Sequence, residues 1–200
     1  MPKGRYGTFD EQRPKGLRRR TLSGGSEWWR IESQDADSWE WSGFPEPRNR
    51  FDPASGMFRT RYAADTLHGA ARERYSGTGR YVPTDHAGEH LVQLVATQPL
   101  KVLDLRTESN LDALGADDRI NTGKEDAVLG ACHRLADCCR LWWPDLDGLI
   151  YRPRTTPESS ANLAFFGSEA FRFTSRRLDS CTAELDELVL RHEFTIGFAY

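Results

Sequence analysis

The sequence predicts a single α+β domain with a mixed sheet. Candidate strands often follow one another directly, with helical segments interspersed, whereas a doubly wound parallel sheet needs regular alternation of strand and helix. The length of 200 residues favours one domain and is enough to bury a core without a metal or disulfide staple. Six Trp, ten Phe and six Tyr argue against a disordered chain, although the mean hydropathy is only -0.65.

The charge distribution divides the chain into a predicted basic flexible N-terminal tail, residues 1–26, and a folded domain, residues 27–200. Residues 1–20 contain seven Lys or Arg against two acidic residues, a net +5, so the remaining residues have a net charge of -8. An acidic domain argues against direct nucleic-acid binding. The tail either touches nucleic acid or an acidic partner, or is a solvated end rich in Gly and Pro, which is the interpretation we adopt.

The first half of the domain is predicted to contain four strands and one helix. Residues 27–31 are a short apolar strand, and residues 58–64 alternate well enough for a second. Asp65 or Thr66 then caps a helix that runs to about Tyr75. Two further strands, at residues 91–96 and 101–105, are joined around Gln98-Pro99.

The second half begins with a short helix that ends near Gly115. The longest helical pattern follows over residues 124–143, and Pro144 ends it. The spacing of three and four predicts that its apolar face consists of Ala127, Ala131, Leu135, Cys138 and Trp142. The remaining predicted elements are strands at residues 149–151, 162–166 and 171–174, an amphipathic helix at 175–191, and a closing strand within 193–200.

The cysteines and histidines do not predict a metal site. Cys132, Cys138, Cys139 and Cys181 include no C-x-x-C pair, so we expect reduced, mostly buried thiols in a cytoplasmic protein. His86 and His90 are four residues apart without an evident third ligand. No apolar segment follows the N-terminal charges as in a signal peptide, and no run of 18 apolar residues predicts a membrane span.

Residues 49–73 contain the side chains best suited to a ligand site. The planar fork of Arg50 matches a phosphate, and Tyr62 offers a flat face for a ring and a hydroxyl for a sugar. A glutamate such as Glu73 binds ribose hydroxyls and stabilises a cation that develops at an anomeric carbon. Together they suit a dinucleotide with a scissile N-glycosidic bond, although on composition alone exposed arginines and a helix-surface glutamate are the default interpretation.

Five segments, in order over about residues 28–166, resemble the RES domain family, which is named for an arginine, a glutamate and a serine. They are Trp29-Arg30-Ile31; Arg50-Phe51-Asp52-Pro53; Tyr62-Ala63-Ala64-Asp65 leading to Ala70-Ala71-Arg72-Glu73; Val102-Leu103-Asp104-Leu105; and Asp147-Gly148-Leu149-Ile150-Tyr151 followed by Asn162-Leu163-Ala164-Phe165-Phe166.

The resemblance implies a fold similar to that of ADP-ribosyltransferase toxins. RES proteins are typically bacterial toxins paired with an antitoxin that has an Xre-type helix-turn-helix. They consume NAD⁺ by hydrolysis, phosphorolysis or, in some members, ADP-ribosyl transfer to a protein. The resemblance therefore implies NAD as substrate, no resident cofactor and an Xre-type antitoxin as partner. The lack of a long apolar run adds the expectation of no membrane contact.

By position, the resemblance assigns the pyrophosphate to Arg30 and Arg50, the nicotinamide–ribose end to Tyr62, and support of the oxocarbenium-like transition state to Glu73. Pro153 stands where the family has its serine, and proline has neither a hydroxyl nor an N–H. Either Ser159 or Ser160 substitutes from a longer loop, or the role is missing; Arg152 or Arg154 then takes some of the phosphate contact.

Three functional hypotheses follow. The first is an NAD-degrading enzyme, a glycohydrolase or phosphorylase, with ADP-ribosyl transfer to a protein as the alternative reaction. The second, motivated by Pro153, is a RES-fold protein that binds a nucleotide or a partner without turning it over. The third, ranked last because the domain is acidic, is a nucleic-acid-associated module that uses the basic tail.

Overall fold

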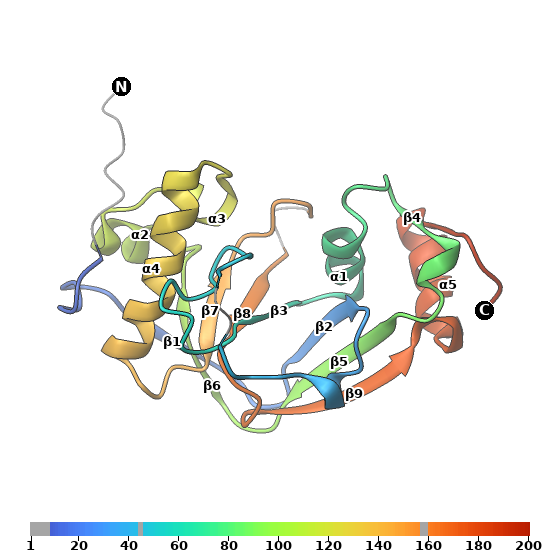
Figure 1. Ribbon diagram of the computed structural model, residues 1–200, viewed down its shortest axis with the longest axis horizontal. Helices are drawn as coiled ribbons and strands as arrows, with labels where there is room; N and C mark the ends of the chain where they lie inside the picture. The colour runs from blue at the N-terminus through green and yellow to red at the C-terminus, as the bar shows by residue number, and fades with distance from the viewer. Residues whose placement is uncertain (1–8, 44–45, 157–159) are drawn as a thin grey trace.

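A curved, mixed β-sheet organises the chain (Figure 1). The computed structural model describes residues 9–43, 46–156 and 160–200. Within these ranges eight strands form one sheet in the order β1-β6-β7-β8-β3-β2-β5-β9, and β10 pairs with β4 in a separate ribbon. The β6–β7 pair is parallel, and the other described pairs of the large sheet are antiparallel. The predicted α+β class with a mixed sheet is therefore confirmed.

The strands are β1 (Arg19–Leu22), β2 (Glu27–Glu32), β3 (Arg61–Ala64), β4 (Tyr81–Val82), β5 (His90–Ala96), β6 (Leu100–Asp104), β7 (Gly148–Tyr151), β8 (Asn162–Phe165), β9 (Phe171–Arg177) and β10 (Thr195–Ile196). The helices are α1 (Leu67–Arg74), α2 (Glu108–Leu114), α3 (Arg119–Thr122), α4 (Asp126–Trp142) and α5 (Thr182–His192). Among the described residues, no helix combines the length and the apolar character needed to cross a membrane.

Two groups of helices cover separate parts of the sheet: α2, α3 and α4 form one group, and α1 and α5 form the other (Figure 1). Helices α2, α3 and α4 form the long crossover that a parallel pair such as β6–β7 requires. Leu135 of α4 packs in one buried cluster with Leu149 of β7, whereas Leu185 of α5 packs in another with Leu91 of β5. A third cluster lies on the opposite face of the sheet and includes Trp28, Leu94 and Phe165. In the described part of the chain, no helix covers the sheet between the two groups (Figure 1).

Several elements agree with their local sequence signals. Thr66 is the N-cap of α1 and accepts a hydrogen bond from the Gly69 N–H at 3.0 Å. Gly115 ends α2 in the left-handed conformation, with φ of 60°. Gly148 opens β7 where an added Cβ would lie 2.3 Å from the Ala164 carbonyl oxygen, so the glycine of the D-G-L-I-Y segment permits the close β7–β8 approach.

The apolar face of α4 differs from the predicted one. Ala127 is exposed and Cys138 is only half-buried. The buried residues of α4 are Val128, Ala131, Cys132, Leu135, Ala136, Cys139 and Trp142. The cluster around β6 and β7 buries a wide stripe of the helix. The spacing pattern placed the centre of this stripe about one residue away from its actual position.

The boundary between β9 and α5 was also predicted wrongly. Residues 175–177 continue β9 and pair with β5, where Ser175 faces Val92 and Arg177 faces His90. The helix begins only at Thr182, after a 3₁₀ turn at Leu178–Ser180. Strand pairing with β5 overrides the helical periodicity, because that periodicity was read from the chain without its neighbours.

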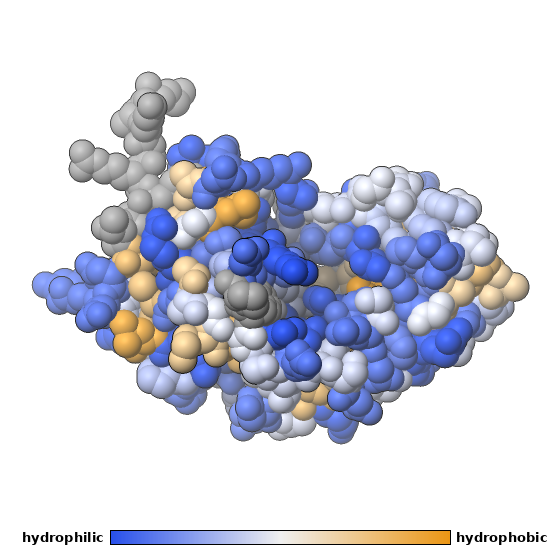
Figure 2. All heavy atoms as spheres, viewed as in Figure 1, coloured by the Kyte–Doolittle hydropathy of each residue, from blue (hydrophilic) through white to orange (hydrophobic). Residues whose placement is uncertain are grey.

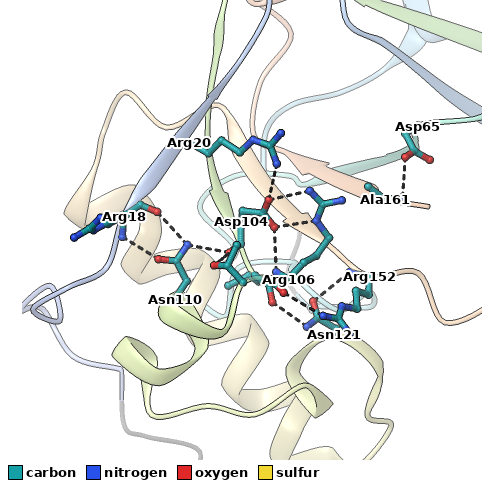
Figure 3. Close-up of polar contacts among 11 residues, drawn as sticks. Arg18, Arg20, Asp65, Asp104, Arg106, Asn110, Asn121, Arg152 and Ala161 are labelled. Atoms are coloured by element: carbon teal, nitrogen blue, oxygen red, sulfur yellow. Dashed lines mark hydrogen bonds and ion pairs between the residues drawn. The ribbon is translucent and has the colours of Figure 1, made fainter. Parts of the chain in front are cut away.

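Part of the predicted tail is a strand of the sheet. Residues 19–22 form β1, which pairs with β6 from Arg19–Leu103 to Leu22–Leu100, and Leu17 is buried. Figure 3 shows how polar contacts fix this segment: the Asn110 side chain of α2 binds both the N–H and the carbonyl of Arg18, at 2.9 and 3.1 Å. Residues 1–8 lie outside the described residues.

Asp104, at the end of β6, joins these segments (Figure 3). Its buried carboxylate accepts hydrogen bonds from Arg106 at 2.8 and 2.9 Å and from Arg20 of β1 at 3.1 Å. Burial alone would raise the pKa of Asp104, but the hydrogen bonds and charge of Arg106 and the bond from Arg20 outweigh it and lower the pKa. The ionised form is therefore the one that stabilises the fold.

We predict that Asp104→Asn lowers the free energy of unfolding by about 2 kcal/mol at pH 7, because a buried carboxylate loses its charge-assisted hydrogen bonds to the partly exposed Arg106 and Arg20. Since the folded pKa is depressed, this stabilisation is complete above the unfolded value of about 4 and is lost as the pH falls through the folded value. Urea denaturation at pH 7 and pH 3 measures it: the difference from the wild type should shrink at pH 3. Asp145→Asn, which removes an exposed partner of Arg19 and Lys101, is the matched control and should cost much less.

Candidate functional site

A cavity of about 640 Å³ lies over the central strands, between α1 on one side and α3 and α4 on the other. Figure 2 shows the surface hollowed between these two groups of helices. Its floor and walls come from β2, β3, β7, β8 and the segment that contains Arg48 and Asn49. The volume is within the range that accommodates small-molecule ligands and cofactors.

The structure brings together Arg30, Arg50, Tyr62 and Glu73, which all line this cavity. They come from β2, from the loop before β3, from β3 and from the last turn of α1. Ser160 is described but does not line the cavity, whereas Ser159 lies outside the described residues. The ligand roles of all six residues stay predictions.

Arg30 occupies the place where β2 and β3 separate. In the described chain these strands share one residue pair, Trp29 with Ala64. Beyond it, the Arg30 Nη1 donates to the Tyr62 carbonyl oxygen at 2.8 Å, and Nη2 donates to Glu32 Oε2 at 2.8 Å. Both terminal nitrogens of Arg30 are therefore bound within the protein, whereas its buried Nε has no hydrogen-bond partner among the described residues. Glu32 pairs with Arg30 and also with Arg61.

Arg50 is held by backbone carbonyls rather than by a carboxylate. Its Nη1 donates to the Ile120 oxygen at 3.2 Å and its Nη2 to the Gly123 oxygen at 2.7 Å. These bonds fix α3 and the turn into α4 against the cavity, and among the described residues no carboxylate pairs with Arg50. Burial raises the pKa of the neighbouring Cys132 to about 11, although Arg50 opposes the shift, so this thiol is neutral and unsuited to nucleophilic attack at neutral pH.

The Tyr62 hydroxyl is engaged away from the cavity. It donates to Asp52 Oδ1 at 2.8 Å and accepts from the Phe51 N–H at 3.0 Å. Burial raises the pKa of Tyr62, and the Asp52 carboxylate raises it further. Asp52 is fully buried and also accepts the N–H groups of Arg48 and Asn49. What Tyr62 offers a ligand is therefore its ring.

Glu73 presents an exposed carboxylate at the edge of the cavity. Its Oε1 accepts a hydrogen bond from the Thr155 hydroxyl. Burial raises the pKa of Tyr151, and the nearby negative charge of Glu73 raises it further, so this phenol stays protonated. The Tyr151 hydroxyl in turn accepts from Asn162 Nδ2 at 3.3 Å.

Buried acceptors without partners line the same cavity. Glu32 Oε1 and Asn162 Oδ1 make no hydrogen bond within the described chain, although Asn162 is only 4% exposed. A buried polar atom without a partner costs free energy that a ligand donor would recover. Asn162 and Tyr151 belong to segments that resemble the RES family, but the sequence assigns neither a role. The two residues are paired across β7 and β8, and only this strand pairing places them together in the cavity.

The cavity has an excess of positive charge. The described lining includes five arginines, Arg30, Arg48, Arg50, Arg74 and Arg154, against Glu32 and Glu73. Arg30 pairs with Glu32, and Arg74 pairs with Glu89. Within the described part of the chain, Arg48 and Arg154 have no hydrogen-bonding or ion-pair partner for their guanidinium groups. Arg152, by contrast, points away to the Arg106 carbonyl and to Asp118.

Comparison with protein-family models matches residues 27–186 to the RES domain. The chain belongs to the RES family. Among solved structures, the RES domain is similar to a chain of the M. tuberculosis MbcT–MbcA toxin–antitoxin complex, with a TM-score of 0.55 and 16% identity over 78% of this chain and 85% of that one. This likeness shows a shared fold. No curated protein matches the sequence.

We predict that Tyr62→Phe destabilises the RES domain by about 2 kcal/mol, because the buried Phe51 N–H loses its acceptor and Asp52 loses a donor. Urea denaturation measures the change. Tyr81→Phe, at a side chain that is 40% exposed, is the control and should have little effect. Equal losses in the two variants would contradict the proposed structural role of the Tyr62 hydroxyl.

Proposed function

We propose that this RES protein consumes NAD⁺ by cleaving the nicotinamide–ribose N-glycosidic bond, as a glycohydrolase or a phosphorylase. The observation that best supports the proposal is the shared cavity, which is lined both by Glu73 and by Arg48, Arg50 and Arg154, three arginines without a carboxylate partner among the described residues. A ligand with two negative charges at one end and a developing positive charge at the other matches this arrangement.

Arg48, Arg50 and Arg154 are the best candidates for the pyrophosphate. Arg50 is fixed by two carbonyls and has no carboxylate partner in the described part of the chain. Arg48 and Arg154 line the cavity with guanidinium groups that have no partner among the described residues. A planar guanidinium binds a phosphate through two parallel hydrogen bonds. Arg30, which is paired with Glu32 and bound to the Tyr62 carbonyl oxygen, then shapes the floor of the site rather than supplying the main phosphate contact.

Glu73 is proposed to stabilise the charge that develops at the ribose. As the C1′–N bond breaks, its electron pair leaves with neutral nicotinamide and the ribose becomes an oxocarbenium-like cation. A fixed carboxylate near that carbon lowers the energy of the transition state. Water or inorganic phosphate then forms the new C1′–O bond, and the nucleophile's proton passes to solvent. The protonated Tyr151 and the Asn162 Oδ1 are available as a donor and an acceptor at this end.

The similarity to a toxin–antitoxin complex supports a biological role as well. We propose that the protein is the toxin of a bacterial pair, acts in the cytoplasm and is restrained by an antitoxin of the Xre helix-turn-helix type. An enzyme that drains NAD⁺ needs such a restraint in the cell that makes it. ADP-ribosyl transfer to a protein is the alternative reaction, since the same cation accepts any nucleophile that reaches it.

A second candidate function is nucleotide binding without turnover. Pro153 is buried at the position where the family serine is expected and supplies no hydroxyl. On this hypothesis NAD⁺ or ADP-ribose binds and no product forms.

We expect the purified protein, at catalytic amounts, to release nicotinamide from NAD⁺. Mass spectrometry with and without phosphate identifies the co-product, ADP-ribose for hydrolysis or its 1″-phosphate for phosphorolysis. Glu73→Gln should lower turnover at least about 100-fold while the protein stays folded, and Glu108→Gln, at an exposed residue of α2, is the control. Intact NAD⁺ under both conditions would refute the enzyme, and measurable affinity without product would favour the binding protein.

We predict that Arg48→Ala and Arg154→Ala each raise the KM for NAD⁺ by about tenfold, the loss of one charge-assisted phosphate contact. The increase should diminish at high salt, which screens the interaction in the wild type as well. Arg152→Ala is the matched control, because this neighbouring arginine points away from the cavity. Equal KM values for Arg154→Ala and Arg152→Ala would exclude Arg154 from the phosphate site.

A further inference from the structure

We infer that Thr155 is a positioning residue that holds the Glu73 carboxylate in the orientation required for bond cleavage. The inference rests on the proposed function and deepens it, because it assigns the orientation of Glu73 to one hydroxyl outside α1. It also identifies a hydroxyl at the site that does not come from residue 153, 159 or 160.

The contacts come from two consecutive residues of α1. The Thr155 hydroxyl donates to Glu73 Oε1, and the Arg72 Nε donates to the Thr155 carbonyl oxygen at 2.9 Å. One contact uses the side chain of Thr155 and the other its main chain. The segment after β7 is therefore attached to the last turn of α1 at a single residue, through independent bonds.

The same segment is fixed at its other end. The Arg152 N–H donates to Asn121 Oδ1 at 3.2 Å, and Asn121 is buried and bound to the Leu105 carbonyl oxygen at 3.0 Å. Between the two attachments Pro153 is buried, and its ring restricts the backbone. Residues 152–155 thus connect α3 on one side of the cavity with α1 on the other, and Thr155 is placed beside Glu73 by the fold.

Glu73 needs such a contact because of where it lies. It is an exposed residue in the final turn of a short helix, and a free glutamate side chain there samples several rotamers. A hydroxyl that donates to one carboxylate oxygen selects one orientation and leaves the other oxygen available. Transition-state stabilisation depends on such fixed orientation, since misplacement by about 1 Å is costly.

Thr156 offers a matched comparison. Its hydroxyl oxygen is enclosed and has no hydrogen-bond partner within the described residues, so Thr156→Val removes a neighbouring hydroxyl without breaking a bond. Thr155→Val removes the bond to Glu73 but leaves the Arg72 contact to the main chain. The cavity arginines should keep their places, and the loss should therefore affect kcat rather than KM.

The test compares Thr155→Val, Thr155→Ser and Thr156→Val with the wild type in NAD⁺ turnover, after thermal unfolding confirms that each is folded. We expect kcat of Thr155→Val to fall about 10- to 100-fold with KM changed less than about threefold. Thr155→Ser should restore at least half of the wild-type kcat, and Thr156→Val should resemble the wild type. In a Glu73→Gln background, Thr155→Val should have no further effect.

A second measurement separates this inference from the proposed function. The ¹³C resonance of the Glu73 carboxyl, assigned by its loss in Glu73→Gln, should shift in Thr155→Val and not in Thr155→Ser or Thr156→Val, whether or not NAD⁺ is consumed. If the wild type is inactive but Thr155→Val shows this shift, the proposed enzymatic activity is refuted while the Thr155–Glu73 hydrogen bond is supported. The inference is overturned if the resonance does not change in Thr155→Val. It is also overturned if the enzyme is active and Thr155→Val leaves kcat unchanged, affects only KM, or has an additive effect in the Glu73→Gln background.

Discussion

The separation of β2 from β3 is the constraint on which the candidate site depends. In the described chain, β2 pairs with β5 over six residues and β3 with β8 over four, yet β2 and β3 share only Trp29–Ala64. Strands that part inside a sheet leave backbone groups unpaired, which is costly when they are buried. Arg30 compensates by binding the Tyr62 carbonyl oxygen, and Glu32 balances the charge that this introduces. The cavity floor stays open because the Arg30 side chain, rather than a neighbouring strand, binds this carbonyl oxygen.

The arginines around that floor divide into two groups. Arg30 and Arg61 share Glu32 as an ion-pair partner and lie over the Trp39 ring, so both are engaged within the protein, although Arg30 also lines the cavity. Arg48, Arg50 and Arg154 face the cavity without a carboxylate partner among the described residues. Charges that are balanced inside the protein add little to the affinity for an anion, whereas uncompensated ones at a partly enclosed surface attract it. The distinction between structure and ligand binding thus follows from charge pairing rather than from residue type.

Local signals were sufficient for much of the fold. The cap at Thr66, one of two predicted candidates, and the stop at Gly115 each act within a few residues, and the structure has both. The strand predicted at residues 149–151 is also present and begins one residue earlier, at Gly148. The failures involve distant partners. β1 forms because β6 offers it an edge, and β9 extends through Arg177 because β5 pairs with it. A short window of sequence contains neither partner strand. Because residues 19–22 and 175–177 are rich in arginine, the sequence pattern predicted a tail for the first segment and a helix for the second.

The sequence by itself determined the chemistry available to this protein: a family framework, several arginines, and a glutamate at the end of a capped helix. It did not determine which groups remain free to act. Tertiary structure directs the Tyr62 hydroxyl to Asp52, the Arg30 guanidinium to the Tyr62 carbonyl oxygen and the Thr155 hydroxyl to Glu73. These outcomes depend on hydrogen bonds between segments 10 to 82 residues apart or across diverging strands, and the direction of a side chain there is fixed by its neighbours in space rather than by its neighbours in the chain.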